Sequence, residues 1–428
     1  MRQKILILGA GASGLAAAYK LCDSKYDITI LEARSRVGGR IHSFEDNFDG
    51  YVEGGAEFIH GKLPTTLSFL KYFSIDYQKT SGKWYRVKCG KVEKTDSFIE
   101  HYSLLEKHLK ALKEDLSVND FLNFHFPGDE YTDFKQSVRS FVEGYDAADT
   151  FKASTLNFKE TWLKDDDSQQ YRIEGGYCKL TDALYGYLSR QGVEIHLNTI
   201  VKEIRWSNGN VAVKTEDNKI FIADKIIITL PPPLVADKKL KAGIEYIPPL
   251  VLQTNAAGKI GYGSVIKILI EFKDTFWENP DFSNAGWILS DEIIPTWWTQ
   301  QPKETKLLTG WVAGPQAEKI SQKSDSEILD LCYESLGNIF KLSSDYLSSI
   351  TQATKVLNWK TDPFSAGAYS YATINRLKQI QILNEPVANV IYFAGEALET
   401  ENTGTVEAAL VSGMKVADKI ISELKVIS

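Results

Sequence analysis

Apolar residues near the start of the chain follow two different spacings. Residues 4–8 (KILIL) form an apolar run, which is typical of a strand buried on both faces. A glycine-rich segment comes next, followed by helical spacing of apolar residues over 15–21 and a second strand-like run over 27–31 (DITIL). This order predicts a β-α-β unit at the N-terminal end.

Further strand patterns occur far along the chain. Residues 192–201 and 225–230 have strand character, and three prolines at 231–233 are expected to end the second of these strands. Residues 263–272 alternate apolar and other side chains, which predicts a half-buried strand. Residues 390–394 predict a last buried strand.

Helical patterns separate these strands. Residues 98–145 are predicted to be helical, with leucines between 104 and 112 spaced for core packing. Residues 324–341 and 405–424 predict two further helices, and the acidic run 165–167 predicts a solvated loop. Because the strand-rich pieces are interleaved with other segments in 428 residues, we expect two domains that share the chain discontinuously.

Charge and cysteine usage exclude several classes of protein. The net charge of −7, with no basic region, argues against a nucleic-acid binder and is compatible with a cationic substrate. The four cysteines are scattered without metal-ligand spacing, so we expect no metal site and free thiols in a reducing compartment. They are Cys22, Cys89, Cys178 and Cys332.

Membrane insertion is not expected either. No segment has the roughly 20 consecutive apolar residues that span a bilayer. The apolar N-terminal segment carries glycines at fixed positions, which a binding motif explains better than a secretion signal. We therefore expect a cytoplasmic protein.

The first motif with chemical content is the sequence GAGASG between the first strand and the first helix. Its glycines would permit a tight turn, a close approach of the backbone to a pyrophosphate, and packing of the helix on the strand. The helix N-terminus would supply N–H donors, and Glu32 at the end of the second strand would bind a ribose hydroxyl. The residues expected to hold the dinucleotide here are Gly9, Gly11, Ala12, Ser13, Gly14 and Glu32.

A second glycine pair follows at once. The residues Ala33, Arg34, Gly39 and Arg40 lie in a segment that resembles the extended fingerprint of the two-dinucleotide-binding flavoproteins. In that group the bound dinucleotide is FAD, so the resemblance implies FAD rather than NAD.

The third motif is the segment 54–61 (GGAEFIHG). It resembles a stretch of the flavin amine oxidase family, which includes polyamine oxidases, spermine oxidases and lysine-specific histone demethylases. The resemblance implies that Gly55, Ala56, Glu57 and Phe58 approach the flavin and that His60 faces the substrate channel. The alternative for this histidine is a structural hydrogen bond to a loop.

Lys267 lies in the sequence GYGSVIKI, which is followed by Phe276 and Trp277. This arrangement resembles the family segment whose lysine binds a water beside flavin N5. A charged residue among apolar neighbours is costly without a partner. The alternative is an edge-strand lysine whose ammonium reaches solvent.

The segment from Trp359 to Tyr369 resembles the family stretch that runs beneath the flavin. Ala368 stands where monoamine oxidases have the cysteine that bonds to the flavin, so the resemblance implies a non-covalent FAD. Tyr369 matches one wall of the aromatic cage in front of the flavin. Val201 is also expected to contact the cofactor.

The C-terminal motifs resemble the last FAD-binding segment of the family. The resemblance places Gly395 and Glu396 near the ribityl chain, and Thr405 and Val406 at a helix start that points at the flavin. Monoamine oxidases have a second cage tyrosine at the position of Thr405. The smaller residue here implies a half-open cage that suits longer amines.

Together these motifs predict an α/β fold with two parts. The resemblance implies a Rossmann-like FAD-binding domain of the two-dinucleotide-binding type and a discontinuous α+β substrate-binding domain. The FAD-binding domain is expected to comprise residues 1–80, 171–250 and 361–428, and the substrate-binding domain residues 81–170 and 251–360.

The expected activity is FAD-dependent amine oxidation with a polyamine as the most suitable substrate. A hydride would pass from the carbon beside the amine nitrogen to flavin N5, and O2 would accept the electrons to give hydrogen peroxide and an imine or aldehyde. Lys267, His60 and Tyr369 are the expected catalytic residues. Acidic groups must hold the distal ammonium, and the candidates are Glu57, Glu143, Asp146 and Glu174.

Three alternatives remain open from the sequence. An L-amino acid oxidase would need an arginine for the substrate carboxylate, and Arg86, Arg139 and Arg172 are available. A monoamine oxidase of the same superfamily is the second alternative, and a non-catalytic FAD-binding protein is the third. The oligomeric state is open as well.

Overall fold

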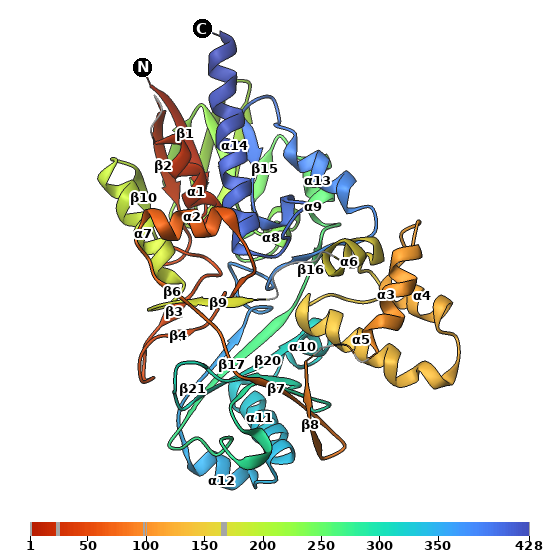
Figure 1. Cartoon of the computed structure of the whole chain (residues 1–428). Coiled ribbons are helices and arrows are strands. Elements are labelled where there is room, and N and C mark those ends of the chain that lie inside the picture. The colour runs from red at the N-terminus through yellow and green to blue at the C-terminus, as the bar shows by residue number, and fades with distance from the viewer. Residues whose placement is uncertain (1, 23–25, 97–98, 100, 164–168, 428) are drawn as a thin grey trace.

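The computed structural model describes residues 2–22, 26–96, 99, 101–163 and 169–427, and the predicted acidic loop at 165–167 lies outside this part. Figure 1 shows a parallel sheet with its helices at one end of the molecule, together with both chain termini, and a larger sheet at the other end. A group of helices lies to one side between them. Within the described residues, no helix is long and apolar enough to cross a membrane.

The parallel sheet has five strands in the order β10-β2-β1-β14-β23. Ile5 and Ile7 of the central strand pack against helices on one face, whereas Leu6 and Leu8 pack against a second sheet on the other face. The predicted strand at 4–8, buried on both faces, is thereby confirmed. The strands are β1 (Gln3–Leu8), β2 (Tyr26–Leu31), β10 (Glu194–His196), β14 (Lys225–Ile228) and β23 (Ile391–Phe393).

Helices and a four-stranded sheet cover the two faces. The predicted β-α-β unit and the predicted C-terminal helix are confirmed, and the first and last helices of the chain lie against each other beside the sheet (Figure 1). The helices are α1 (Ala12–Leu21), α2 (Pro64–Tyr72), α7 (Cys178–Arg190), α8 (Pro232–Ala236), α9 (Val251–Ala257), α13 (Arg376–Asn384) and α14 (Val406–Ile427). The second sheet contains β11 (Val201–Ser207), β12 (Asn210–Thr215), β13 (Ile220–Ala223) and β15 (Glu245–Ile247).

Two of the predicted strand boundaries are wrong. Residues 192–201 do not form one strand, because after β10 the backbone amides of Asn198 and Thr199 donate to the carbonyls of Arg34 and Glu32 and the chain leaves the sheet. Residues 225–230 end as a strand at Ile228, before the prolines, and those prolines begin the short helix α8.

The second large sheet has seven strands in the order β21-β17-β20-β19-β18-β7-β8. Strand β17 (Val265–Phe272), between β21 and β20, is buried at every position, so the predicted half-buried strand is wrong. Ile266 and Ile268 pack against the helices on one face, and Leu269 on the other face packs against Phe48. The other strands are β7 (Lys83–Lys88), β8 (Lys91–Thr95), β18 (Ala285–Ser290), β19 (Thr296–Trp298), β20 (Leu307–Ala313) and β21 (Thr351–Asn358).

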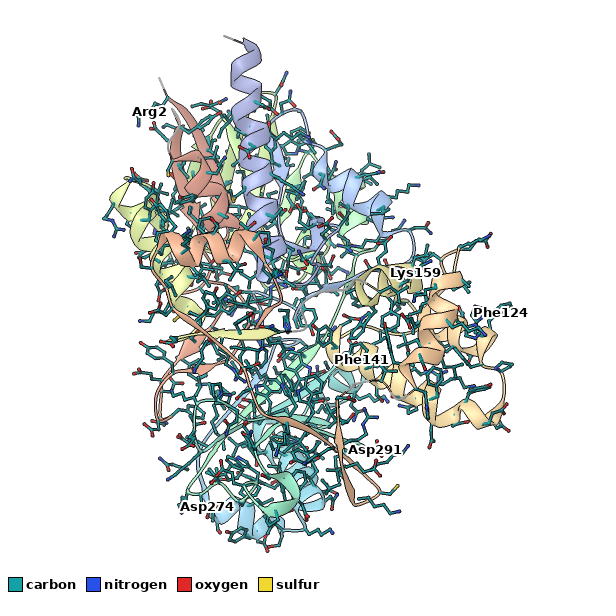
Figure 2. All side chains as sticks on the ribbon, viewed as in Figure 1. Arg2, Phe124, Phe141, Lys159, Asp274 and Asp291 are labelled. Atoms are coloured by element: carbon teal, nitrogen blue, oxygen red, sulfur yellow. The ribbon has the colours of Figure 1, made fainter. Side chains whose placement is uncertain are left out.

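Helices complete the two remaining cores. The predicted helix at 324–341 is confirmed as α11 (Asp325–Phe340), which begins with a capping box and packs on the large sheet beside α10 (Gly314–Ile320) and α12 (Ser344–Ser349). Where the structure describes it, the predicted helical region 98–145 is confirmed as three helices, which together with one helix beyond this region form a bundle (Figure 2) with its own apolar core. Its helices are α3 (Tyr102–Ala111), α4 (Val118–His125), α5 (Thr132–Tyr145) and α6 (Thr155–Trp162).

Short elements connect the large parts. The three-stranded sheet β5-β9-β6 joins the glycine segment at 54–61 to the strand that follows residue 169. The short strands are β3 (Ser43–Phe44), β4 (Val52–Glu53), β5 (Ile59–His60), β6 (Tyr77–Lys79), β9 (Gln170–Ile173), β16 (Gly261–Tyr262) and β22 (Ser370–Tyr371). The 3-10 turns are η1 (Asp129–Tyr131), η2 (Pro280–Phe282) and η3 (Glu396–Leu398).

Candidate functional site

One large cavity of about 1920 Å³ lies among the parallel sheet, the large sheet and the helical bundle. Ordinary small-molecule sites measure about 300–1,000 Å³, so this cavity has room for a dinucleotide and a substrate together. It is lined by every residue predicted to be catalytic or to bind the cofactor, except Gly14. These residues are Gly9, Gly11, Ala12, Ser13, Glu32, Ala33, Arg34, Gly39, Arg40, Gly55, Ala56, Glu57, Phe58, His60, Val201, Lys267, Trp359, Tyr369, Gly395, Glu396, Thr405 and Val406.

The glycine motif divides into a packing residue and a residue that opens onto the cavity. A Cβ at Gly14 would lie 2.0 Å from the Gly9 carbonyl oxygen, so a glycine is needed there for α1 to pack on β1. A Cβ at Gly11 would meet nothing within 4 Å. The Ser13 hydroxyl is buried beside this open space and has no hydrogen-bond partner in the described structure. An uncapped helix N-terminus with an unpartnered hydroxyl fits a phosphate group.

Glu32 is held in place at the end of β2. Its carboxylate accepts hydrogen bonds from the backbone amides of Ala10 (2.7 Å) and Arg34 (2.8 Å). Burial raises the pKa of Glu32, and these two amides oppose that shift. A carboxylate has about four acceptor positions, so two remain for hydroxyl groups in the cavity. This arrangement fits the predicted ribose contact.

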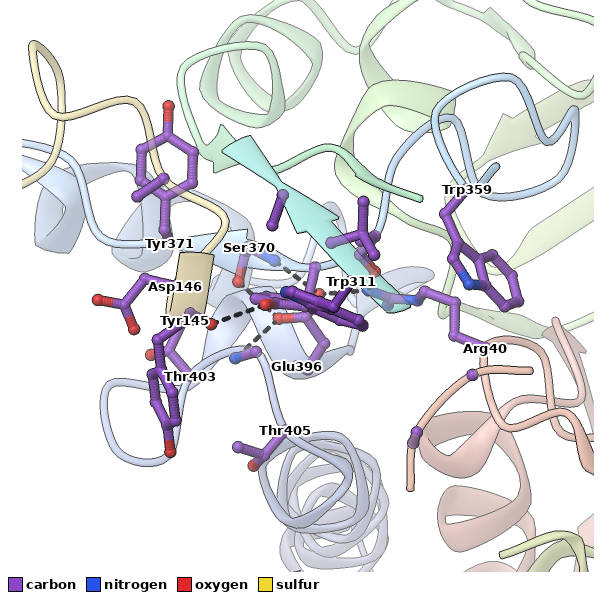
Figure 3. Close-up of a pocket in the computed structure, with 18 of the residues that line it drawn as sticks. Arg40, Tyr145, Asp146, Trp311, Trp359, Ser370, Tyr371, Glu396, Thr403 and Thr405 are labelled. Carbon is purple, nitrogen blue, oxygen red and sulfur yellow. Dashed lines mark hydrogen bonds and ion pairs between the residues drawn. The ribbon is translucent and has the colours of Figure 1, made fainter. Parts of the chain in front are cut away.

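Both predicted arginines are paired with carboxylates far away in the sequence. Arg34 donates to both carboxylate oxygens of Asp362 (3.0 and 2.6 Å), and this pairing outweighs burial and lowers the pKa of that carboxyl. Arg40 donates to Glu396 (2.8 Å) and to the carbonyl of Ala368 (2.6 Å). These pairs tie the N-terminal motifs to the C-terminal segments on one wall of the cavity, where Figure 3 shows Arg40 and Glu396.

The C-terminal segments are ordered by the same acidic residue. Glu396 accepts hydrogen bonds from the Ser370 hydroxyl (2.5 Å) and from the Gly404 backbone amide (3.1 Å). Thr405 then begins α14, because its hydroxyl accepts from the Ala408 amide (3.2 Å) (Figure 3). The N-terminal end of this long helix therefore faces the cavity, as predicted.

Lys267 lies at the opposite wall in a buried ion pair. Its ammonium donates to the Glu57 carboxylate (2.7 Å) and to the Gly55 carbonyl (3.2 Å), and the side chain is 1% exposed. Lys267 comes from the middle of a strand buried on both faces. The alternative of a lysine that reaches solvent from an edge strand is therefore wrong.

Glu57 is fully engaged by the protein. In addition to Lys267, it accepts from Arg172 (2.8 Å), from the Trp298 indole (3.0 Å) and from the Gln300 amide (3.5 Å). Burial by itself would raise its pKa, but the neighbouring Lys267 and Arg172 lower that pKa to about 2. Glu57 is therefore a structural anion at the cavity wall. The hypothesis that it holds a distal substrate ammonium is wrong.

Aromatic side chains form the wall between these residues and the helical bundle. The Tyr369 hydroxyl donates to the Tyr145 carbonyl (2.7 Å), and His60 Nδ1 lies 3.4 Å from the Tyr145 hydroxyl. Burial lowers the pKa of His60 to about 4, so this histidine is neutral at pH 7. Trp311 continues the wall toward the large sheet (Figure 3).

The remaining acidic candidates differ in whether they line the cavity. Glu143 and Asp146 line the cavity, whereas Glu174 is exposed and lies outside it. Burial raises the pKa of Asp146 to about 7. The Glu143 carboxylate accepts from the Thr150 hydroxyl (3.1 Å), whereas among the described residues no cation pairs with Asp146.

The arginines proposed for a substrate carboxylate also separate. Arg172 is committed to Glu57 and to the carbonyls of Thr299 and Gln301. Arg139 lies outside the cavity lining and donates to two asparagines. Of these three arginines, Arg86 is the one that lines the cavity.

Several lining residues had no counterpart in the sequence motifs. The indoles of Trp287, Trp298 and Trp311 contact one another in a row with their ring planes tilted, and their ring centroids are 5.1 and 5.8 Å apart. Tyr145 and Trp162 enter from the helical bundle, with centroids 6.0 Å apart. The high density of tryptophan between 287 and 311 was the available signal, but strand pairing was needed to bring these rings together.

Comparison with known proteins agrees with this geometry. The sequence matches the family described as flavin containing amine oxidoreductase over residues 12–95 and 96–421. It is 27% identical to polyamine oxidase 4 of Oryza sativa, covering 97% of this chain and 88% of that protein. It is 26% identical to lysine-specific histone demethylase 1 homolog 3 of Arabidopsis thaliana, where 99% of this chain matches 30% of that protein. The chain thus spans less than a third of that relative.

Solved structures show the same fold. Putrescine oxidase bound to putrescine superposes with a TM-score of 0.80 at 19% identity, covering 99% of each chain. Cyclohexylamine oxidase from Brevibacterium oxydans IH-35A gives a TM-score of 0.81 at 17% identity, covering 99% of this chain and all of that one. The family match spans nearly the whole sequence, and the cavity carries the features that fit a dinucleotide. The chain therefore belongs to the flavin containing amine oxidoreductase family, and its cofactor is FAD.

Proposed function

We propose that this protein is an FAD-dependent amine oxidase that acts on a polyamine. The observation that carries the proposal is Asp146, a carboxylate without a cationic partner in the described structure, which lines the same cavity as the aromatic wall and Lys267. A polyamine presents a reacting amine and a second, distal ammonium. The aromatic wall would enclose its methylene chain, and Asp146 would bind its distal charge.

Ser13, Glu32 and the N-terminal end of α14 would hold FAD, which when bound would supply two-electron oxidation of the carbon beside the amine nitrogen, with O2 as acceptor and hydrogen peroxide as product. The protein would supply orientation and a dry environment. Tyr369 and His60 would confine the amine between aromatic surfaces. Lys267 would present an N–H to the cavity, and the half-open cage at Thr405 would leave room for a substrate longer than a monoamine.

Residues of the chain also support a non-covalent cofactor. Ala368 lines the cavity, and none of the four cysteines, all of which lie in the described part, does so. We further propose the division into an FAD-binding domain (1–80, 171–250, 361–428) and a substrate-binding domain (81–170, 251–360). The free thiols support a cytoplasmic location.

A substrate panel tests the activity. Oxygen uptake and peroxide formation would be followed with spermine, benzylamine and L-leucine, using the Glu174→Gln variant as a control for a charge change outside the cavity. Turnover of spermine in preference to the other two supports the proposal. Preference for leucine would move the function to an L-amino acid oxidase and direct attention to Arg86. Preference for benzylamine would favour a monoamine oxidase. No turnover by a flavin-loaded protein would favour the non-catalytic alternative.

A further inference from the structure

The strongest feature that the proposed reaction leaves unexplained is the buried charge cluster behind Lys267. Glu57 and Lys267 are 3% and 1% exposed at their side chains, and Arg172 is 17% exposed. Each isolated buried charge is costly, and pairing offsets the cost only when hydrogen bonds satisfy both ions. Three ionised groups, of which Glu57 and Lys267 line the reaction cavity, therefore require an explanation beyond packing.

The two oxygens of Glu57 have separate partners. Oε2 accepts from the Lys267 ammonium (2.7 Å), whereas Oε1 accepts from Arg172 Nε (2.8 Å) and the Trp298 indole (3.0 Å). Arg172 is fixed in turn, because its other nitrogens donate to the carbonyls of Gln301 and Thr299 (3.1 and 3.0 Å). The carboxylate therefore has little freedom to rotate, and it holds the lysine from one side.

The Lys267 ammonium has one N–H donor beyond those used in its two hydrogen bonds. A lysine ammonium has three N–H donors. Two of them point at Glu57 Oε2 and the Gly55 carbonyl, and no further hydrogen bond joins the ammonium to the described residues. The Lys267 side chain also lines the cavity. One N–H is thus available to a group inside the cavity, and its direction is set by the other two bonds.

We propose that Glu57, held by Arg172, is a positioning residue that keeps the Lys267 ammonium charged and aims its third N–H into the cavity. This inference rests on the proposed function. The other ionisable group near the pair is Glu53, which accepts from the Ser43 hydroxyl (2.6 Å) and the Tyr177 amide. Burial raises the pKa of Glu53 to about 7, so it supplies less negative charge at neutral pH than Glu57 does.

The Glu57→Gln variant separates charge from shape. The amide occupies nearly the same volume, but it leaves Lys267 and Arg172 buried together without an anion. Arginine remains protonated in proteins, so the lysine is the group that becomes neutral as the pH rises. The visible spectrum of bound oxidised flavin responds to nearby charge. We expect a new spectral transition between about pH 6 and 9 in this variant and none in the wild type.

A double-mutant cycle identifies the route of the effect. In the Lys267→Met background, Glu57→Gln should produce no spectral transition, because the titrating group is gone. In the wild-type background the same substitution should lower kcat/KM for amine oxidation by about 10- to 100-fold, as expected for the loss of a hydrogen bond to a charged group. The Glu57→Asp variant keeps the anion and should show no new spectral transition.

The outcomes are distinguishable. A transition in Glu57→Gln that disappears in the double variant supports the proposal. An unchanged spectrum over the pH range, or an equal loss of kcat/KM in both backgrounds, overturns it. If Glu57→Gln does not fold, the Glu57→Asp variant serves as the test. Its shorter side chain keeps the charge but changes the position of the carboxylate. A wild-type kcat/KM in Glu57→Asp would therefore contradict the positioning role of Glu57. The spectral titration needs no substrate, so failure of wild-type turnover refutes the proposed function alone.

Discussion

Asp146→Asn is the substitution that most directly separates polyamine binding from general amine oxidation. Asp146 follows α5 at the cavity wall beside Tyr145, and among the described residues no cation pairs with it. A hydrogen bond between a carboxylate and an ammonium contributes about 1.5–3 kcal/mol to the free energy of binding. The variant should therefore weaken spermine binding by about 10- to 100-fold.

The pH dependence of binding has a definite sign. Burial raises the pKa of Asp146 to about 7. Above that pH the carboxylate is ionised and binds the distal ammonium, and as the pH falls through 7 it protonates and binding weakens. Spermine affinity should therefore rise with pH through about 7 in the wild type, and the variant should lack this component.

Stability supplies an independent check. Because the folded pKa of Asp146 is raised, the native state binds more protons than the unfolded state between about pH 4 and 7. The contribution of Asp146 to the free energy of unfolding of the wild type therefore falls as the pH rises from about 4 to 7. Above pH 7, Asp146→Asn should be more resistant to urea than the wild type, whereas Glu174→Gln should match the wild type.

The assay is anaerobic stopped-flow reduction of the flavin, with spermine and benzylamine compared at several pH values. The apparent Kd for spermine should increase in Asp146→Asn, while the Kd for benzylamine, which has no distal charge, should not. An unchanged spermine Kd would refute the assignment of Asp146. Equal weakening for both amines would indicate damage to the cavity rather than loss of a specific contact.

Three further predictions follow from the geometry. Gly11→Ala should leave the melting temperature of the apoprotein unchanged but weaken FAD binding. Gly14→Ala should lower the free energy of unfolding by about 1–3 kcal/mol, because its Cβ would clash with a backbone carbonyl. Calorimetry and flavin fluorescence measure the two effects, and equal effects in the two variants would contradict their different roles. Thr405→Tyr should close the cage and lower the activity on spermine relative to that on benzylamine. It should also remove a helix cap that contributes about 1 kcal/mol to stability. A wild-type ratio of spermine activity to benzylamine activity would contradict this prediction. Asp362→Asn should destabilise the protein by about 3 kcal/mol in urea, because it leaves Arg34 without its bidentate partner, and a change under 1 kcal/mol would contradict this estimate.

The N-terminal part was predictable because its signals are local. The glycine turn, the helix and the acid at Glu32 lie within one β-α-β unit, so sequence spacing determines their relative positions. The roles of Gly11 and Gly14 follow from the same short segment. The resemblance to the family then extended the prediction to Lys267 and Thr405, which lie hundreds of residues away.

The interior of the site was less accessible to sequence reasoning. Glu57 and Arg172 are 115 positions apart, and their contact depends on β9 pairing with β5. The strand at Lys267 looked half-buried because its second face carries polar residues, but that face is covered by other parts of the chain. Alternation shows which residues share a face, and it does not show what covers that face.

We propose above all that this protein binds FAD in its large cavity and oxidises polyamines there. The most direct test is to add spermine to the purified flavin-loaded protein without oxygen while the visible spectrum is recorded. The oxidised flavin band should bleach with spermine and return when air is admitted. A flavin that stays oxidised with spermine would contradict the polyamine assignment, and a protein that takes up no FAD would contradict both the cofactor and the activity.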